Sequence, residues 1–117
     1  EHIHTWGMLA LVETRGPEDL DLISSARPRL VGVNNKNIDE LEMGEDEVRI
    51  TAEMLVRYRQ VVGETLIISE SALRTPADVR RSLAAGADAV LVGTAFLVAE
   101  NPAAAVASFV RAGEAAS

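Results

Sequence analysis

The chain has 117 residues, enough for a single domain with a modest hydrophobic core. Its formal net charge is −7 at pH 7 and no cluster of Lys and Arg offsets it, which argues against a nucleic-acid partner. The absence of cysteine excludes disulfides and thiolate metal sites. No apolar run is long enough to span a membrane and no signal peptide is visible, so we expect a cytoplasmic protein with no membrane partner.

Four short apolar runs predict β-strands. Each run is almost continuous rather than alternating between apolar and polar residues, which is typical of parallel strands covered on both faces. In chain order the runs are Leu9–Thr14, Leu30–Asn34, Thr65–Glu70 and Ala89–Gly93.

A helix signal follows each of the first three runs. Pro17 and the acids after it open a helix in which Leu20 and Ile23 share one face. The stretch Glu45–Val62 has the apolar period of an amphipathic helix. Thr75 is a good N-cap, and a capping box with Asp78 starts the third helix.

The C-terminal part holds the remaining helix signals. Gly86 ends the third helix in the left-handed conformation that glycine adopts readily. The segment Thr94–Glu100 is too short for a full helix, so we expect one or two extra turns there. Asn101 and Pro102 start a last helix that we expect to reach Ala112.

The resulting alternation of strands and helices predicts an α/β fold with a parallel sheet and right-handed crossovers. We expect one domain over residues 1–117. Because eight parallel strands are needed to close a barrel, four units fit either a small open sheet or half of a (β/α)8 barrel. Periodicity alone does not separate these two architectures.

Polar residues stand at the carboxyl end of every predicted strand. They are Glu13, Asn34, the pair Glu70–Ser71, and the pair Gly93–Thr94. A single residue of this kind is equally a solvated loop residue or a helix cap, but the ends of parallel strands converge on one volume. Two carboxylates held there in a partly apolar setting suit acid or base catalysis.

Glycine before a short helix predicts an anion site. Gly93 and Thr94 would point backbone amides at a phosphate, and a short extra helix after the last barrel strand is a recurrent phosphate-binding device. The alternative is that Gly93 only lets strand and helix pack closely. No metal site is predicted, since His2 and His4 have no other ligand-type residues around them, and Trp6 is expected to pack against the body of the protein.

Several segments resemble the indole-3-glycerol-phosphate synthase family, (β/α)8-barrel enzymes of tryptophan biosynthesis. The similarity runs from about Leu9 to Val110 and corresponds to strands five to eight, the C-terminal half of that barrel. GVNNKNI and the following ISES form a fairly specific pair, whereas the closing AGADAVLVGTA occurs in several phosphate-binding barrels. The segments are LVET (Leu11–Thr14), GVNNKNI (Gly32–Ile38), ISES (Ile68–Ser71), TPADV (Thr75–Val79) and AGADAVLVGTAFLVAENPAAAV (Ala85–Val106).

The resemblance implies a lyase reaction, the decarboxylating ring closure of 1-(2-carboxyphenylamino)-1-deoxyribulose 5-phosphate to indole-3-glycerol phosphate. Glu13 would be the general base in dehydration, and Asn34 would orient the substrate. Glu70 and Ser71 would contact its ribulose hydroxyls. No metal or organic cofactor is implied, and the partner would be a phosphorylated small molecule.

The phosphate side of the implied site departs from the family pattern. The amides of Gly93 and Thr94 would bind phosphate, with Ala72 lining the same loop region. Ala72 replaces a usual Gly, and its methyl is unwelcome if the position needs φ > 0. Lys36 replaces a usual Arg in substrate binding, which keeps the charge but loses the planar fork.

The family's general-acid lysine, a second essential lysine and another catalytic glutamate belong to the first half of the barrel. Lys36 is the single lysine of this chain, so we expect the isolated chain to be inactive and to need a missing N-terminal half-barrel or a second copy of itself. Its apolar sheet edges favour such pairing. The alternatives are a stand-alone half-barrel that dimerises or binds a phosphorylated ligand, and another phosphate-binding barrel enzyme. The NNKN and SES pair argues against the latter.

Overall fold

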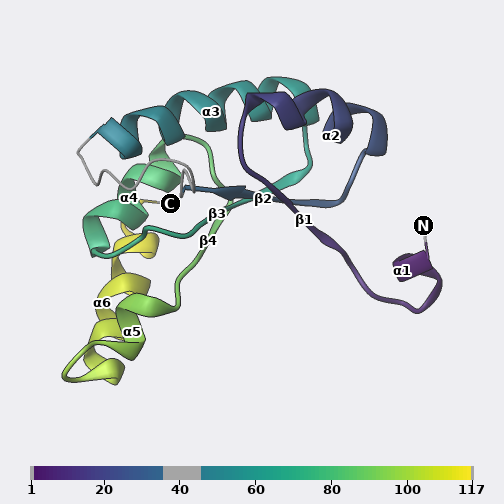
Figure 1. Cartoon of the computed structure of the whole chain (residues 1–117). Coiled ribbons are helices and arrows are strands. Elements are labelled where there is room, and N and C mark those ends of the chain that lie inside the picture. Colours follow the sequence, from purple (N-terminus) through teal and green to yellow (C-terminus); the bar gives the residue numbers. More distant parts are fainter. Residues whose placement is uncertain (1, 36–45, 117) are drawn as a thin grey trace.

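The computed structural model describes residues 2–35 and 46–116 (Figure 1). Four parallel strands form one sheet in the order β1-β2-β3-β4. The strands are β1 (Leu11–Thr14), β2 (Leu30–Asn34), β3 (Leu66–Glu70) and β4 (Ala89–Leu91). The helices are α1 (His2–Thr5), the 3-10 turn η1 (Pro17–Asp19), α2 (Leu20–Ala26), α3 (Asp46–Val62), α4 (Pro76–Ala84), α5 (Thr94–Leu97) and α6 (Pro102–Glu114).

All four predicted strands form, within two residues of their predicted ends. Strand order follows chain order, as in consecutive units of a (β/α)8 barrel, because each helical crossover returns the chain beside the strand it left. The short turn predicted after the last strand is α5, and the last helix runs two residues past Ala112. The architecture predicted from the alternation of elements is therefore confirmed.

The helices α2, α3, α4 and α6 form a layer on one face of the sheet. Figure 1 shows α2 and α3 along the strands, with α4 and α6 continuing the same layer. Strand residues that point into this layer, such as Val31, Val33 and Ile67, are fully buried. A cluster joins them to Ile23 of α2 and Tyr58 of α3, and this cluster is the main hydrophobic core.

A second, smaller core lies between α4 and α6. Val79, Phe109 and Ala112 are buried there, with Val90 of β4 packed against them. The rings of Phe96 and Phe109 meet edge to face at a centroid distance of 5.0 Å, a favoured aromatic geometry. This core fixes β4 and α5 relative to the helix layer.

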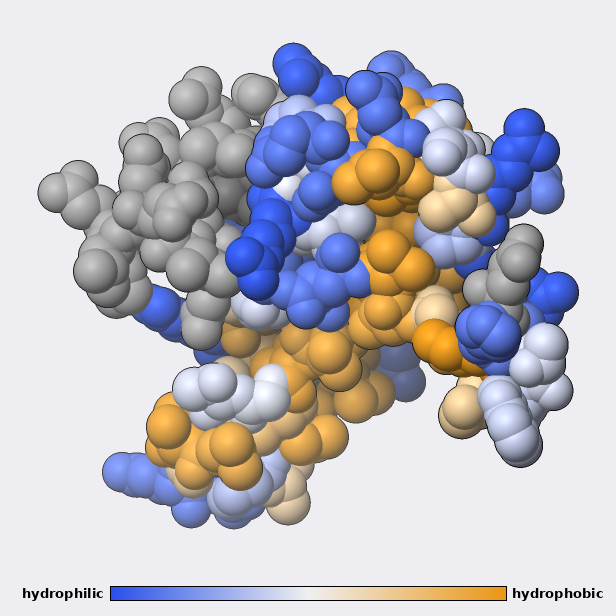
Figure 2. Space-filling model, turned by 45° about the vertical axis from the view of Figure 1, so that its right-hand side comes forward, coloured by the Kyte–Doolittle hydropathy of each residue, from blue (hydrophilic) through white to orange (hydrophobic). Residues whose placement is uncertain are grey.

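The opposite face of the sheet is open in the part of the chain that the structure describes, which corrects the expectation that both faces are covered. Leu11, Leu66 and Leu91 point to that face and keep 39%, 51% and 55% of their surface exposed. Figure 2 shows hydrophobic side chains gathered through the middle of one face of the molecule. Continuous apolar strands are typical of a sheet that is buried on both faces, but the described helices cover only one face of this sheet.

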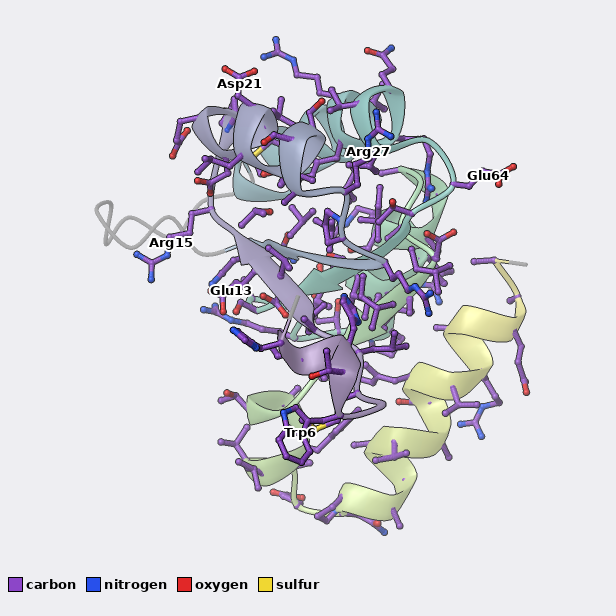
Figure 3. The ribbon with its side chains drawn as sticks, turned by 90° about the vertical axis from the view of Figure 1, so that its right-hand side faces the viewer. Trp6, Glu13, Arg15, Asp21, Arg27 and Glu64 are labelled. Carbon is purple, nitrogen blue, oxygen red and sulfur yellow. The ribbon has the colours of Figure 1, made fainter. Side chains whose placement is uncertain are left out.

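Trp6 does not pack as predicted. Trp6 is 79% exposed (Figure 3), and Met8 and Leu9, between α1 and β1, are 56% and 54% exposed. Leu97 and Val98, at the end of the α5 helix that follows β4, are 86% and 76% exposed. The segment before one edge strand and the segment after the other therefore carry uncovered apolar side chains, which is typical of surfaces that meet another chain segment.

Arg59 of α3 joins the segments at the amino ends of β3 and β4. Its guanidinium donates to the carbonyl oxygens of Gly63, Thr65 and Gly86, and it forms an ion pair with Asp88 at 2.5 Å. Asp88 also accepts from the backbone N–H of Ile67 at 2.8 Å. Charge-assisted bonds of this kind are stronger than neutral ones, so this end of the sheet serves stability.

No helix among the described residues is long and apolar enough to cross a membrane.

The capping box of α4 gives the first prediction. The hydroxyl of Thr75 accepts from the backbone N–H of Asp78, whose carboxylate accepts from the Thr75 N–H at 2.8 Å. Thr75→Ala should lower the free energy of unfolding by about 1 kcal/mol, measured by urea denaturation. Thr5→Ala is the matched control, because Thr5 bonds only within the exposed α1, and it should cost less than about 0.5 kcal/mol. Equal effects of the two changes would contradict this account.

Candidate active site

The parallel register brings the polar strand ends together on the open face. Glu13 of β1 lies beside Gly32 of β2, and Asn34 lies beside Glu70 of β3. Since side chains two apart on a strand share a face, these side chains all project from the side that the helices leave open. The convergence predicted from the sequence is therefore present in the fold.

A short hydrogen bond joins the first two strand ends. The side-chain amide of Asn34 donates to Oε1 of Glu13 at 2.7 Å. Glu13 remains exposed, whereas Asn34 is half-buried. The bond therefore fixes the direction of a carboxylate that is still open to solvent and to a ligand.

Glu70 lies inward of Glu13, against the backbone of the central strand. Its residue is only 5% exposed. A Cβ atom built on Gly32 would lie 2.9 Å from Oε1 of Glu70, so any side chain at position 32 would force this carboxylate to move. Glycine inside a strand often marks such a close approach. Gly32 thus provides the space that Glu70 occupies.

Burial raises the pKa of Glu70 above its ordinary value of 4.5, and the negative charge of Glu13 raises it further. A raised pKa increases the fraction of protonated carboxyl near neutral pH, which suits a group that gives or takes a proton. The pair therefore has the chemical asymmetry of an acid–base site, with one exposed and one buried carboxyl group.

The chain turns sharply after Glu70. Ser71 and Ala72 adopt φ values of +65° and +52°, in the left-handed region. For a residue with a Cβ this conformation costs roughly 1–2 kcal/mol. Ala72 therefore stands at a position with φ > 0, where its methyl group is unfavourable and the usual glycine would be less strained.

A cavity of about 720 Å³ opens beside these residues. This volume is in the range of small-molecule sites. It lies between the ends of β1, β3 and β4 and the first residues of α5. Its lining residues are Glu13, Glu70, Ser71, Ala72, Leu73, Arg74, Leu91, Val92, Gly93, Thr94, Ala95 and Val98.

Most of the residues predicted for the site line this cavity. They are Glu13, Glu70, Ser71, Ala72, Gly93 and Thr94. Asn34 does not line it but holds Glu13. Lys36 lies outside the described residues.

Gly93 directly precedes α5, as an anion site would need. Its φ and ψ are −129° and −70°, and no side chain caps the helix. A Cβ atom built on Gly93 would meet nothing within 4 Å, so close packing between strand and helix does not explain this glycine. The alternative that Gly93 only lets strand and helix pack closely therefore has no support in the structure.

Three features of the site were missed in the sequence. Gly32 had a visible signal, because it interrupts an apolar strand. Arg74 lines the cavity but follows the strand by four residues, where no pattern points inward. Asn35 bonds to the turn after β3 across 36 positions of sequence, which only the strand register reveals.

Ligand groups for a metal do not gather here. Among the side chains that the structure describes, no three of His, Asp or Glu lie close enough together to hold a metal ion.

Sequence comparison connects the chain with one enzyme family. The family model for indole-3-glycerol phosphate synthase matches residues 1–109. This chain belongs to the indole-3-glycerol phosphate synthase family. A relative with that name from Pyrococcus furiosus is 38% identical over 106 residues, which cover 91% of this chain and 45% of the relative. Another, from Saccharopolyspora erythraea, is 35% identical over 114 residues, or 97% of this chain and 40% of the relative.

The chain spans less than half the length of these synthase relatives. Solved structures agree on the fold. The Amycolatopsis orientalis BexX/CysO complex matches with a TM-score of 0.71 and 19% identity, over 98% of this chain and 45% of the other. A mandelate oxidase variant matches with a TM-score of 0.56 and 21% identity, over 95% and 38%. At these identities the likeness shows the fold alone, half of a barrel built from parallel βα units.

The buried carboxyl group makes stability depend on pH. Because the pKa of Glu70 is raised in the folded state, its contribution is present below the ordinary value of 4.5 and is lost as pH rises through the folded pKa. Glu70→Gln should therefore flatten the fall in the free energy of unfolding above pH 4.5 and give a more stable protein than the wild type at pH 7–8. Urea denaturation at several pH values measures both curves.

Glu64→Gln is the matched control for the chemical change, since Glu64 points into solvent at the opposite end of the sheet (Figure 3). A Glu70→Gln curve parallel to that of the wild type would contradict the assignment of Glu70 as a buried, destabilised carboxylate.

Proposed function

We propose that this chain supplies one half of the active site of an indole-3-glycerol-phosphate synthase. The reaction would be the ring closure of 1-(2-carboxyphenylamino)-1-deoxyribulose 5-phosphate to indole-3-glycerol phosphate, with loss of CO2 and water. The observation that carries the proposal is the meeting of Glu13, Asn34 and Glu70 beside the cavity that Ser71 and Gly93 line. Family membership supports the same reaction.

The carboxylates take the proton-transfer roles in this proposal. Glu13, exposed and directed by Asn34, is the general base in dehydration, which needs a carboxylate within reach of the substrate. Glu70 contacts the ribulose hydroxyls, and because its pKa is raised its protonated form can donate a hydrogen bond to them. Asn34 acts by orienting Glu13 and the substrate. Lys36 binds substrate as a point charge.

The phosphate binds beside the start of α5 in this proposal. The backbone amides of Gly93 and Thr94, at the start of α5, bind it, and Ser71 and Ala72 complete the loop around it. Distance from Glu13 and Glu70 matters, because two carboxylates would repel a phosphate dianion. No metal or organic cofactor has a role in this scheme.

A second four-strand segment completes the barrel in this proposal. The open face exposes Leu11, Leu66 and Leu91, and the relatives are more than twice as long as the matched region. An N-terminal (β/α)4 half would cover that face and bring the lysines that this chain lacks. Residues 1–117 then form a single C-terminal half-barrel domain, inactive by itself.

Alternatively, a second copy of the chain could cover the open face of the sheet. The same exposed edges support it, and a dimer of halves would approximate a closed barrel without the missing catalytic lysines. Such an assembly would bind a phosphorylated ligand rather than catalyse the ring closure.

Activity distinguishes the two assemblies. The chain should form no indole-3-glycerol phosphate alone, and should form it when mixed with the N-terminal half of the Pyrococcus furiosus relative, as measured by the fluorescence of the indole product. In the mixture, Glu13→Gln should lower kcat by about 10²-fold or more, because a general base contributes at least that much. Glu64→Gln should leave kcat unchanged.

Turnover by the chain alone would contradict the assignment of half a site. An inactive mixture, together with a stable homodimer in sedimentation, would instead favour the binding module.

A further inference from the structure

The turn after β3 is held from outside the cavity. Ser71 and Ala72 are consecutive residues with φ > 0, and both carry a side chain that makes this conformation unfavourable. Such a conformation persists only where the surroundings determine it. The contacts that hold this turn therefore also determine the shape of the cavity, because the turn forms one of its walls.

Asn35 donates three hydrogen bonds to the last residues of β3 and to Ser71 just after it. Its side-chain amide donates to the carbonyl oxygen of Ser71 at 2.9 Å and to the hydroxyl of Ser69 at 3.0 Å. Its backbone N–H donates to the carbonyl oxygen of Glu70 at 2.8 Å. One residue at the end of β2 thus contacts three successive residues that lead into the turn.

A serine pair anchors this arrangement to the helix layer. Ser69 is fully buried, and its hydroxyl donates to that of Ser82 on α4 at 3.1 Å. The bonds from Asn35 to Ser69 and to Ser71 therefore connect the turn to both β2 and α4. Asn35 itself is not among the residues that line the cavity.

We propose that Asn35 is a positioning residue that holds Ser71 and Ala72 in the left-handed conformation in which the turn binds the phosphate of the substrate. Asn35 acts through the turn and does not touch the ligand. This inference rests on the proposed phosphate site, and it adds a residue to it that neither lines the cavity nor follows the same strand. The usual glycine of the family would need less support at position 72 than Ala72 does.

Removal of the Asn35 side chain should have a local effect. The backbone bond from position 35 to Glu70 and the bond between Ser69 and Ser82 both remain after Asn35→Ala. The sheet should therefore keep its register, while the turn loses the hydrogen bond from the Asn35 side chain to the Ser71 carbonyl oxygen.

The experiment follows binding of inorganic phosphate to the chain through the amide resonances of Ser71, Ala72, Gly93 and Thr94. Asn35→Ala should shift the resonances of Ser71 and Ala72 before phosphate is added, and should weaken phosphate binding by about tenfold, because the displaced turn would lose about one of its own hydrogen bonds to the phosphate. Asn101→Ala is the matched control, since Asn101 also bonds a backbone group but at the start of α6. It should leave phosphate affinity unchanged.

Restored binding separates positioning from general destabilisation. In the double variant Asn35→Ala with Ala72→Gly, glycine adopts φ > 0 without strain, so phosphate affinity should recover by several-fold. A structural defect elsewhere would not be repaired by this change.

The other possible results of this experiment distinguish the positioning role of Asn35 from the phosphate site itself. Wild-type affinity in Asn35→Ala, or no recovery in the double variant, would overturn the positioning role alone. The positioning role would also be overturned if phosphate shifted the amide resonances of Gly93 and Thr94 in the wild-type chain but not those of Ser71 and Ala72. A wild-type chain in which phosphate perturbs none of the four amides would overturn the phosphate site, and this inference with it.

Discussion

Parallel pairing of four consecutive strands is the constraint on which the other features depend. Because every strand runs in the same direction, the polar residue at each carboxyl end reaches the same edge of the sheet, while the chain returns through helices on one side. The helix layer buries Val31, Val33 and Ile67, and this burial fixes the strand register. The register in turn decides that Glu13 lies beside Gly32 and Asn34 beside Glu70.

The register also places the groups of the site next to the residues that hold them. Glu70 stays buried because Gly32 leaves room for it, and Glu13 stays directed because Asn34 donates to it. The open face beneath them exposes leucines that a soluble sheet would normally cover. Carboxylates at the rim and leucines below them are the two parts expected of one wall of a barrel, with its catalytic end and its packed interior.

The sequence predicted much of the fold because its signals are local. Apolar runs, the Thr75 cap and Gly86 mark elements through interactions within a few residues. Strand-end residues were predicted because parallel topology implies that they meet. The uncovered face was not predicted, since a continuous apolar strand looks the same whether its second cover belongs to the same segment or to another one. Asn35 was missed for a related reason, because its contacts depend on register across two strands.

The most direct test of the account is amide hydrogen exchange at the two edge strands, Leu11–Thr14 and Ala89–Leu91, in the chain alone and mixed with the N-terminal half of the Pyrococcus furiosus relative. If the open face is one wall of a barrel, both edges should gain protection together on mixing, while β2 and β3 between them change little. Protection at neither edge, or at only one, would contradict closure of a barrel around this face.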